Sequence, residues 1–121
     1  MDTNQSIDNY VKILKKAYNA FNKRDIASAL ELMMPNVTWP RAFKGGFVQG
    51  HQEIQAYWQE QWHEINPKVV PIDFEAMNEN EITVTVNQIV KNLDGQILAD
   101  EHVKHTFTFT KHLIQGMKLE E

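Results

Sequence analysis

Residues 82–110, ITVTVNQIVKNLDGQILADEHVKHTFTFT, alternate apolar and polar side chains on either side of an Asp94-Gly95 pair. Alternation with a period of two is typical of a β-strand that buries one face. An Asp-Gly pair between two such runs favours a tight hairpin turn, because glycine readily adopts the positive φ angles that the turn requires. The stretch therefore predicts two antiparallel strands, at about 82–90 and 97–110.

Each predicted strand carries one polar side chain on its apolar face. Gln88 shares a face with Val84 and Val86, and His105 shares a face with Phe107. Because the strands are neighbours, Gln88 and His105 should lie on adjacent strands and point to the same side of the sheet. Two inward polar groups need hydrogen-bond partners, which are each other, water or a ligand.

The segments around this hairpin predict three helices and four further strands. Apolar residues at helical spacing predict helices from Ser6 or Asp8 to Asn22, from an Asp25 N-cap to Leu32, and from about His51 to Ile65. Strands are expected at 37–39, around 47–48, from residue 69 with Val70, Ile72, Phe74 and Ala76 on its inner face, and at 113–119 with a bulge at Gly116. This order predicts an α+β fold, with helices packed on one face of an antiparallel sheet.

Composition limits the class of protein. A chain of 121 residues that is 42% hydrophobic fits a single domain, 1–121. A net charge of -4 and scattered basic residues argue against nucleic-acid binding. The absence of cysteine excludes disulfides and thiolate chemistry. A polar start and the lack of any run near the ~20 apolar residues of a membrane span make a soluble, cytoplasmic protein the default expectation.

Four local motifs occur in a recognisable order between residues 7 and 119. They are YNAFNKRD at 18–25, LELMMPNVTW at 30–39, GHQEIQAYW at 50–58, and HTFTF at 105–109 followed by Leu113-Ile114. Together they resemble the nuclear transport factor 2-like superfamily, which includes ketosteroid-isomerase-like and SnoaL-like proteins. The resemblance implies a cone-shaped, curved antiparallel sheet wrapped around three N-terminal helices, a pocket inside the cone, and a homodimer formed through the sheet.

The resemblance also implies positions for site residues. Arg41 falls where isomerase-like members place a carboxylate base, and an arginine cannot abstract a proton at neutral pH. Arg41 either clamps an anionic group of a ligand or lies in solvent on a loop. His105 falls where those members place an acid that donates a hydrogen bond, and it is either a catalytic group or a core histidine satisfied by a neighbour.

Aromatic residues are numerous for so small a domain, and they either fill the core or line a pocket for a flat or apolar ligand. The candidate ligand-binding residues are Trp39, Phe43, Tyr57, Trp58, Trp62, Tyr18, Phe107 and Arg41. No metal site is expected, because His102 and His105 face opposite sides of their strand, and no cofactor is expected.

The leading hypothesis is a small-molecule-binding domain of SnoaL-like type. His105, assisted by Gln88, would perform acid/base chemistry on a polar, aromatic or apolar ligand. The alternative is a non-catalytic dimerisation or assembly module whose interior is filled by the aromatic residues. Nuclear-transport-like protein binding is a third hypothesis, for which the sequence shows no dedicated partner surface.

Overall fold

The computed structural model describes residues 3–41 and 44–120, which form three helices and one six-stranded sheet. The elements are α1 (Thr3–Asn22), α2 (Ile26–Leu30), β1 (Met33–Pro40), β2 (Phe47–Gln49), α3 (Gly50–Glu64), β3 (Asn66–Asn78), β4 (Glu81–Lys91), β5 (Ile97–Thr110) and β6 (Leu113–Glu120). The strand order is β2-β1-β6-β5-β4-β3, so β2 and β3 form the two edges.

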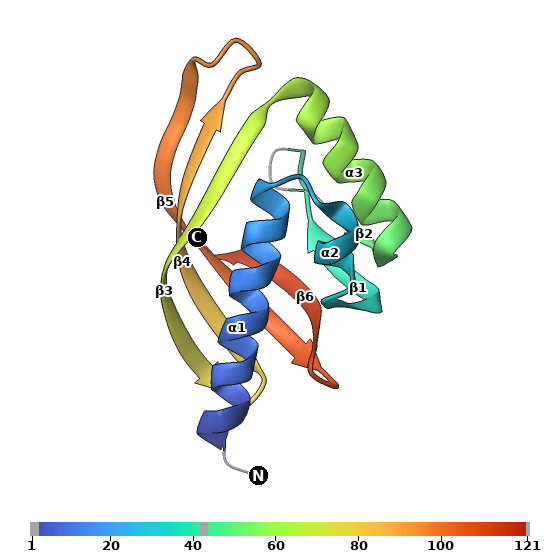
Figure 1. The fold of residues 1–121 in the computed structure, drawn as a ribbon, viewed down its shortest axis with the longest axis vertical. Coiled ribbons are helices and arrows are strands. Elements are labelled where there is room, and N and C mark those ends of the chain that lie inside the picture. The colour runs from blue at the N-terminus through green and yellow to red at the C-terminus, as the bar shows by residue number, and fades with distance from the viewer. Residues whose placement is uncertain (1–2, 42–43, 121) are drawn as a thin grey trace.

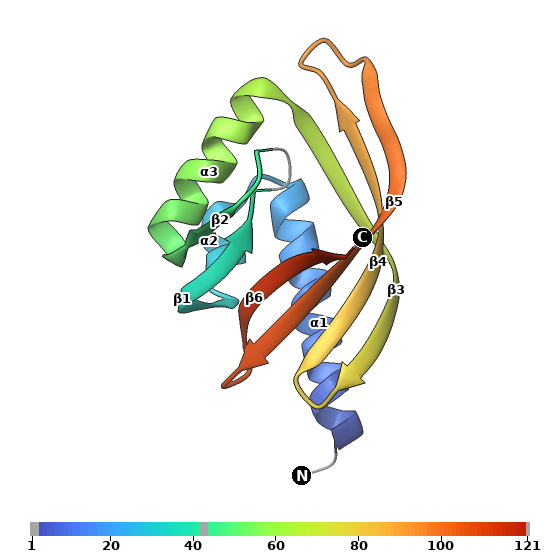
Figure 2. The same cartoon turned by 180° about the vertical axis from the view of Figure 1, so that it is seen from behind.

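The sheet curves around α1 and does not close into a barrel (Figure 1). Helix α1 crosses the hollow side of the long strands, and α2 and α3 lie beside β1 and β2 (Figures 1 and 2). The α+β fold class, with a curved sheet wrapped around three helices, is therefore confirmed.

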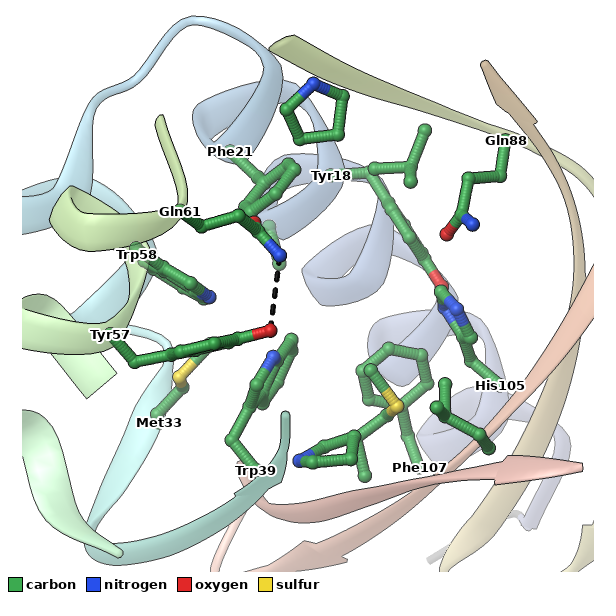
Figure 3. Close-up of a pocket in the computed structure, with 16 residues that line it drawn as sticks. Tyr18, Phe21, Met33, Trp39, Tyr57, Trp58, Gln61, Gln88, His105 and Phe107 are labelled. Carbon is green, nitrogen blue, oxygen red and sulfur yellow. Dashed lines mark hydrogen bonds between the residues drawn. The ribbon is translucent and has the colours of Figure 1, made fainter. Parts of the chain in front are cut away.

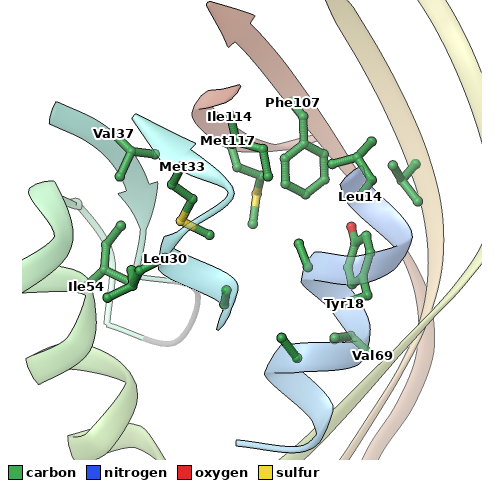
Figure 4. Close-up of a cluster of buried hydrophobic side chains, with 14 of the residues drawn as sticks. Leu14, Tyr18, Leu30, Met33, Val37, Ile54, Val69, Phe107, Ile114 and Met117 are labelled. Atoms are coloured by element: carbon green, nitrogen blue, oxygen red, sulfur yellow. The ribbon is translucent and has the colours of Figure 1, made fainter. Parts of the chain in front are cut away.

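The core lies between α1 and the hollow side of the sheet. Helix α1 presents Tyr10, Leu14 and Tyr18 at spacings of four residues, which places them on one face of the helix. The ring of Tyr10 stacks on Phe109 with centroids 4.0 Å apart, and Leu14 is fully buried beside Phe107 (Figure 4). This packing fixes the orientation of α1 and therefore of Tyr18, which lies one turn beyond Leu14.

Strands β4 and β5 form the predicted hairpin. Ile82, Val84 and Val86 are buried along β4, as the alternation predicts. The connection is longer than the tight two-residue turn that was expected, since it runs from Asn92 to Gln96. Oδ1 of Asn92 accepts hydrogen bonds from the backbone N–H groups of Asp94 and Gln96, which stabilises the longer loop.

The predicted inner face of β3 is wrong for Val70 and Ile72, whereas Phe74 packs against the core as predicted. Val70 and Ile72 are 40% and 53% exposed, and Val69 is buried in their place. The pairing of β3 with β4 shifts register between Pro71 and Asp73. Such a bulge adds one residue to β3. The alternation of inward and outward side chains therefore reverses from one side of the bulge to the other.

The sheet is also not purely antiparallel, because β1 pairs with β6 in parallel. The backbone N–H of Ile114 donates to the carbonyl of Leu32 at 2.9 Å, which draws the chain into the sheet soon after α2. The second helix therefore ends at Leu30 and the first strand begins at Met33, before the positions expected from sequence. Gly116 is required here, since a Cβ atom at this position would lie 2.7 Å from Oγ1 of Thr38.

The remaining helix boundaries agree closely with those predicted from the sequence. Asp25 caps α2, with its Oδ1 accepting from the backbone N–H of Ser28 at 3.2 Å. Helix α3 begins at Gly50, whose φ of 85° is costly for any other residue. Helix α1 begins at Thr3, a few residues before the expected start.

Candidate functional site

A cleft opens into the core between α1, α3 and the hollow side of the sheet. The space among its lining atoms is about 650 Å³ when open solvent at the mouth is included, and about 70 Å³ is wide enough for the centre of a water molecule. The walls are almost entirely apolar (Figure 3). The lining residues are Ala17, Tyr18, Phe21, Met33, Trp39, Pro40, Tyr57, Trp58, Gln61, Pro67, Val69, Gln88, His105, Phe107, Met117 and Leu119.

Tyr18 and His105 form a hydrogen-bonded pair in one wall of this cavity. Oη of Tyr18 lies 2.8 Å from Nδ1 of His105, and the two side chains are only 6% and 5% exposed. The apolar face of α1 that packs on the sheet brings Tyr18 to β5. On β5, His105 points to the same inward side as Phe107 and Phe109. The predicted inward direction of His105 is thus observed, and Tyr18 is its neighbour.

Burial sets the charge of this pair. Removal from water lowers the pKa of His105 from 6.5 to about 4, because the interior disfavours imidazolium. The same cause raises the pKa of Tyr18 well above its usual value of 10. Both groups are therefore uncharged at neutral pH. His105 keeps its second ring nitrogen, Nε2, without a hydrogen-bond partner among the described residues.

Gln88 lines the same cavity from β4. It pairs in register with Glu101, whereas His105 pairs with Val84, so the two polar residues lie four positions apart along the hairpin. No hydrogen bond joins Gln88 to His105 within residues 3–41 and 44–120. Gln88 is half-buried, and its amide is on the same side of the cavity as Tyr18 and His105 (Figure 3).

Helix α3 supplies the opposite wall. Tyr57 and Trp58 reach the cavity, as does Trp39 from β1, so these three predicted residues meet in one place. Gln61 joins them and donates a hydrogen bond through Nε2 to Oη of Tyr57 at 3.0 Å. Sequence reasoning missed Gln61, although its spacing of four residues from Tyr57 places it on the buried stripe of α3.

Two predicted ligand-binding residues, Arg41 and Trp62, do not line the cavity. Arg41 is half-buried, and its Nε donates to the carbonyl of Gly45 at 2.9 Å. Trp62 packs outside the lining with the Arg24 guanidinium 4.7 Å from its ring centroid, and its indole N–H is buried without a hydrogen-bond partner among the described atoms. Phe43 lies outside the described residues.

Two classes of feature are not found in the described part of the chain. No group of three or more histidine, cysteine, aspartate or glutamate side chains gathers there in a way that could hold a metal ion. None of the helices in the same ranges is long and apolar enough to cross a membrane.

Solved structures with the same fold share little sequence identity with this chain. A protein from Burkholderia pseudomallei, described as NTF2-like and of unknown function, has a TM-score of 0.81 at 22% identity, covering 93% of this chain and 89% of its own. TerC, crystallised with polyporic acid, has a TM-score of 0.82 at 21% identity, covering 93% and 90%. RV0760c from Mycobacterium tuberculosis, in complex with estradiol-17β-hemisuccinate, has a TM-score of 0.79 at 15% identity, covering 93% of each chain.

Sequence comparison adds the family. A search of curated proteins finds no match. The model of the SnoaL-like domain matches residues 14–115, a range that contains both Tyr18 and His105 and most of the cavity lining. With the NTF2-like fold of its structural neighbours, this match confirms the resemblance seen in the sequence, and the chain belongs to the SnoaL-like domain family.

Proposed function

We propose that this protein binds a small, largely apolar ring compound in the cavity, and that Tyr18 and His105 carry out acid/base chemistry on an oxygen-bearing group of that compound. The observation that carries the proposal is the 2.8 Å hydrogen bond between these two side chains in a wall that is otherwise almost entirely apolar. A few convergent polar groups in an apolar cavity are typical of small-molecule sites.

Open space in the core supports binding. About 70 Å³ beside Tyr18 and His105 can hold the centre of a water molecule, and this space continues to the surface through the mouth of the cavity. Two structural neighbours were solved with small ring-containing compounds, polyporic acid and estradiol-17β-hemisuccinate. An assembly module with a filled interior would leave no such space beside His105.

The Tyr18–His105 pair can exchange roles without acquiring charge. When Tyr18 donates to Nδ1, the Nε2–H of His105 can donate to a ligand oxygen. When Nδ1 carries the proton and donates to Tyr18, Nε2 is a base and the tyrosine hydroxyl becomes the donor. A proton taken up at Nε2 can thus be balanced by one released from Tyr18, and buried imidazolium need not form. This arrangement suits enolisation of a carbonyl compound, which gains a proton on oxygen as it loses one from carbon.

The binding half of the proposal is tested with 2-naphthol, an uncharged bicyclic phenol, by isothermal titration calorimetry. We expect saturable one-to-one binding that weakens by about fivefold in His105→Phe, because one hydrogen bond is worth roughly 1 kcal/mol. Circular dichroism checks that the variant is folded. The absence of binding to the folded wild-type protein, or equal affinity in both proteins, contradicts the proposal.

The chemical half is tested with 2-tetralone, a bicyclic ketone with acidic C–H groups beside its carbonyl. Nuclear magnetic resonance in D₂O follows the replacement of those hydrogens by deuterium. We expect the wild-type protein to accelerate the exchange above the buffer rate, and Tyr18→Phe and His105→Phe each to abolish the acceleration. Exchange at the buffer rate with the ketone bound would make the protein a binder without acid/base activity.

A further inference from the structure

We infer that Gln61 is a second hydrogen-bonding station, so that the ligand is an uncharged flat molecule with a polar group at each end: an oxygen at Tyr18–His105 and a hydroxyl or N–H group at Gln61. The inference rests on the proposed binding function and assigns to it a ligand class. Its basis is the placement, burial and hydrogen bonding of Gln61, together with the absence of charge in the cavity walls.

Gln61 is buried, and its hydrogen-bonding capacity is only partly used. The side chain is 8% exposed. Its Nε2 donates to Oη of Tyr57, whereas its Oε1 accepts no hydrogen bond from any described residue. Nε1 of Trp62 is the only fully buried side-chain nitrogen or oxygen without a partner among the described residues, so Oε1 of Gln61 is open to the cavity. An amide oxygen has two lone pairs and can accept a hydrogen bond from a donor on a ligand. Gln61 lines the cavity, so such a donor can reach it from within.

The two stations face each other across an apolar gap. Gln61 projects from α3, and Tyr18 and His105 project from α1 and β5 on the other side of the cavity (Figure 3). The indole of Trp39 lies between the two walls in the same view, near Phe107, whose ring centroid is 6.0 Å from it. Aromatic surfaces favour flat apolar rings. The cavity therefore matches a molecule whose polar groups are separated by a ring system.

The described residues of the cavity wall include no charged side chain that could neutralise an ionic ligand. None of the sixteen residues that line the cavity is lysine, arginine, aspartate or glutamate, and burial keeps His105 neutral. Arg41, the cation expected at the site, lies outside the lining and donates to the carbonyl of Gly45. Because an unpaired ion in an apolar site is costly, a neutral ligand is favoured over its carboxylate analogue.

Three naphthols that differ at one position test the assignment by calorimetry at pH 7. All share a hydroxyl at carbon 2, and carbon 6 carries a hydroxyl, a methyl or a carboxylate group. We expect 2,6-dihydroxynaphthalene to bind about tenfold more tightly than 6-methyl-2-naphthol, of which about a factor of two reflects the two equivalent orientations of the symmetric diol. The anionic 6-hydroxy-2-naphthoate should bind more weakly than either.

Two variants assign the preference to a residue. In Gln61→Met, which keeps the length of the side chain and removes its amide, the ratio between diol and methyl compound should fall to about two. In Gln59→Met, which makes the same change at an exposed position of α3, the full preference should remain. Binding of 6-methyl-2-naphthol should persist in both variants, which shows that each is folded and that the Tyr18–His105 station is intact.

The outcomes separate the two proposals. If all three compounds fail to bind the wild-type protein, the proposed function falls and this inference falls with it. If the naphthols bind but the diol has no advantage beyond about a factor of two, or if its advantage survives in Gln61→Met, Gln61 is not the second station. If the carboxylate binds most tightly, the ligand class is wrong.

Discussion

Tyr18 and His105 show how burial fixes the charge of two side chains. Each is more than nine-tenths removed from solvent, and each is the other's hydrogen-bond partner. Burial favours the neutral form of both groups, so the pKa of the histidine falls and the pKa of the tyrosine rises. Both side chains are therefore neutral hydrogen-bonding groups at pH 7, and protonation of His105 in acid disturbs the pair.

Stability should therefore fall with acid in a way that depends on His105. The pKa of His105 is about 4 in the folded protein and 6.5 when unfolded, so between these values the unfolded chain binds more protons. Above pH 6.5 the titration of His105 hardly changes the free energy of unfolding. As the pH falls from 6.5 to 4 the free energy of unfolding decreases, and the loss at pH 4 amounts to about 3 kcal/mol. Urea unfolding at pH 7 and pH 4 measures it, with His105→Gln as the control.

The control isolates this residue because both proteins share every other titrating group. The loss of stability on acidification should be about 3 kcal/mol larger in the wild-type protein than in His105→Gln. Equal losses would mean that His105 titrates alike in the folded and unfolded states.

Alternation was sufficient to predict where some site residues point but not which residues meet. It predicted the inward direction of His105, because a long strand with a clear apolar face leaves little choice. It did not predict that Tyr18 is the partner of His105, since that contact joins residues far apart in sequence. Arg41 was placed by family position alone, and its side chain lies outside the lining, where it donates to the carbonyl of Gly45.

At the scale of elements, the end of α1 covers the open edge of β3. The side chain of Asn22 donates to the carbonyl of Val69 at 2.7 Å and accepts from its N–H at 2.9 Å. Arg24 continues this pattern by donating to the carbonyl of Pro67 at 2.9 Å. An edge strand otherwise presents unpaired backbone groups. Val69 and Pro67 line the cavity, so these contacts also fix part of its wall.

Removal of the Asn22 side chain should destabilise the protein. In Asn22→Ala both backbone groups of Val69 lose their partner, with an expected cost of about 2 kcal/mol. Asn19→Ala is the matched control, because Asn19 lies on the same helix with an exposed side chain and should change the stability by less than about 0.5 kcal/mol. Thermal unfolding of the two variants measures the difference, and equal midpoints would contradict this role of Asn22.

The elements themselves differ in how far the sequence could predict them. The alternation of β4 is regular, and its buried face was predicted correctly from Ile82 to Val86. In β3 the apolar residues Val69 and Val70 are adjacent, so the pattern alone does not say which one faces inward, and the bulge after Pro71 resets the alternation. The parallel pairing of β1 with β6 depends on residues far apart in the chain, which local patterns do not report.

For the whole molecule, the convex face of the sheet is the surface through which we propose that two copies associate. Val70 lies opposite Asn87 on this outer face and is 40% exposed. Thr83 and Thr106 bond to each other across it at 2.8 Å, and Thr106 also donates to Glu120 at 2.7 Å. These short polar side chains are satisfied within the chain, so the face can be covered without leaving them unpaired.

Sedimentation at micromolar concentration should therefore show a dimer. Val70→Glu places a charge on the outer face and should convert the dimer to a monomer, because a buried unpaired charge is costly. Leu93→Glu introduces the same charge in the loop between β4 and β5, where Leu93 is 63% exposed, and should leave the dimer intact. A monomeric wild-type mass at this concentration refutes the proposed association.

The parallel pairing of β1 with β6 has a consequence for biosynthesis. Trp39 on β1 and Met117 on β6 both line the cavity, and the parallel pairing makes their strands neighbours. On the ribosome, β1 is synthesised early, and it stays unpaired with β6 until most of the chain has been translated. Contacts between such distant segments form late, because the intervening chain must first be ordered. The nascent protein can assemble its hairpins early, but the cavity is complete only when β6 docks.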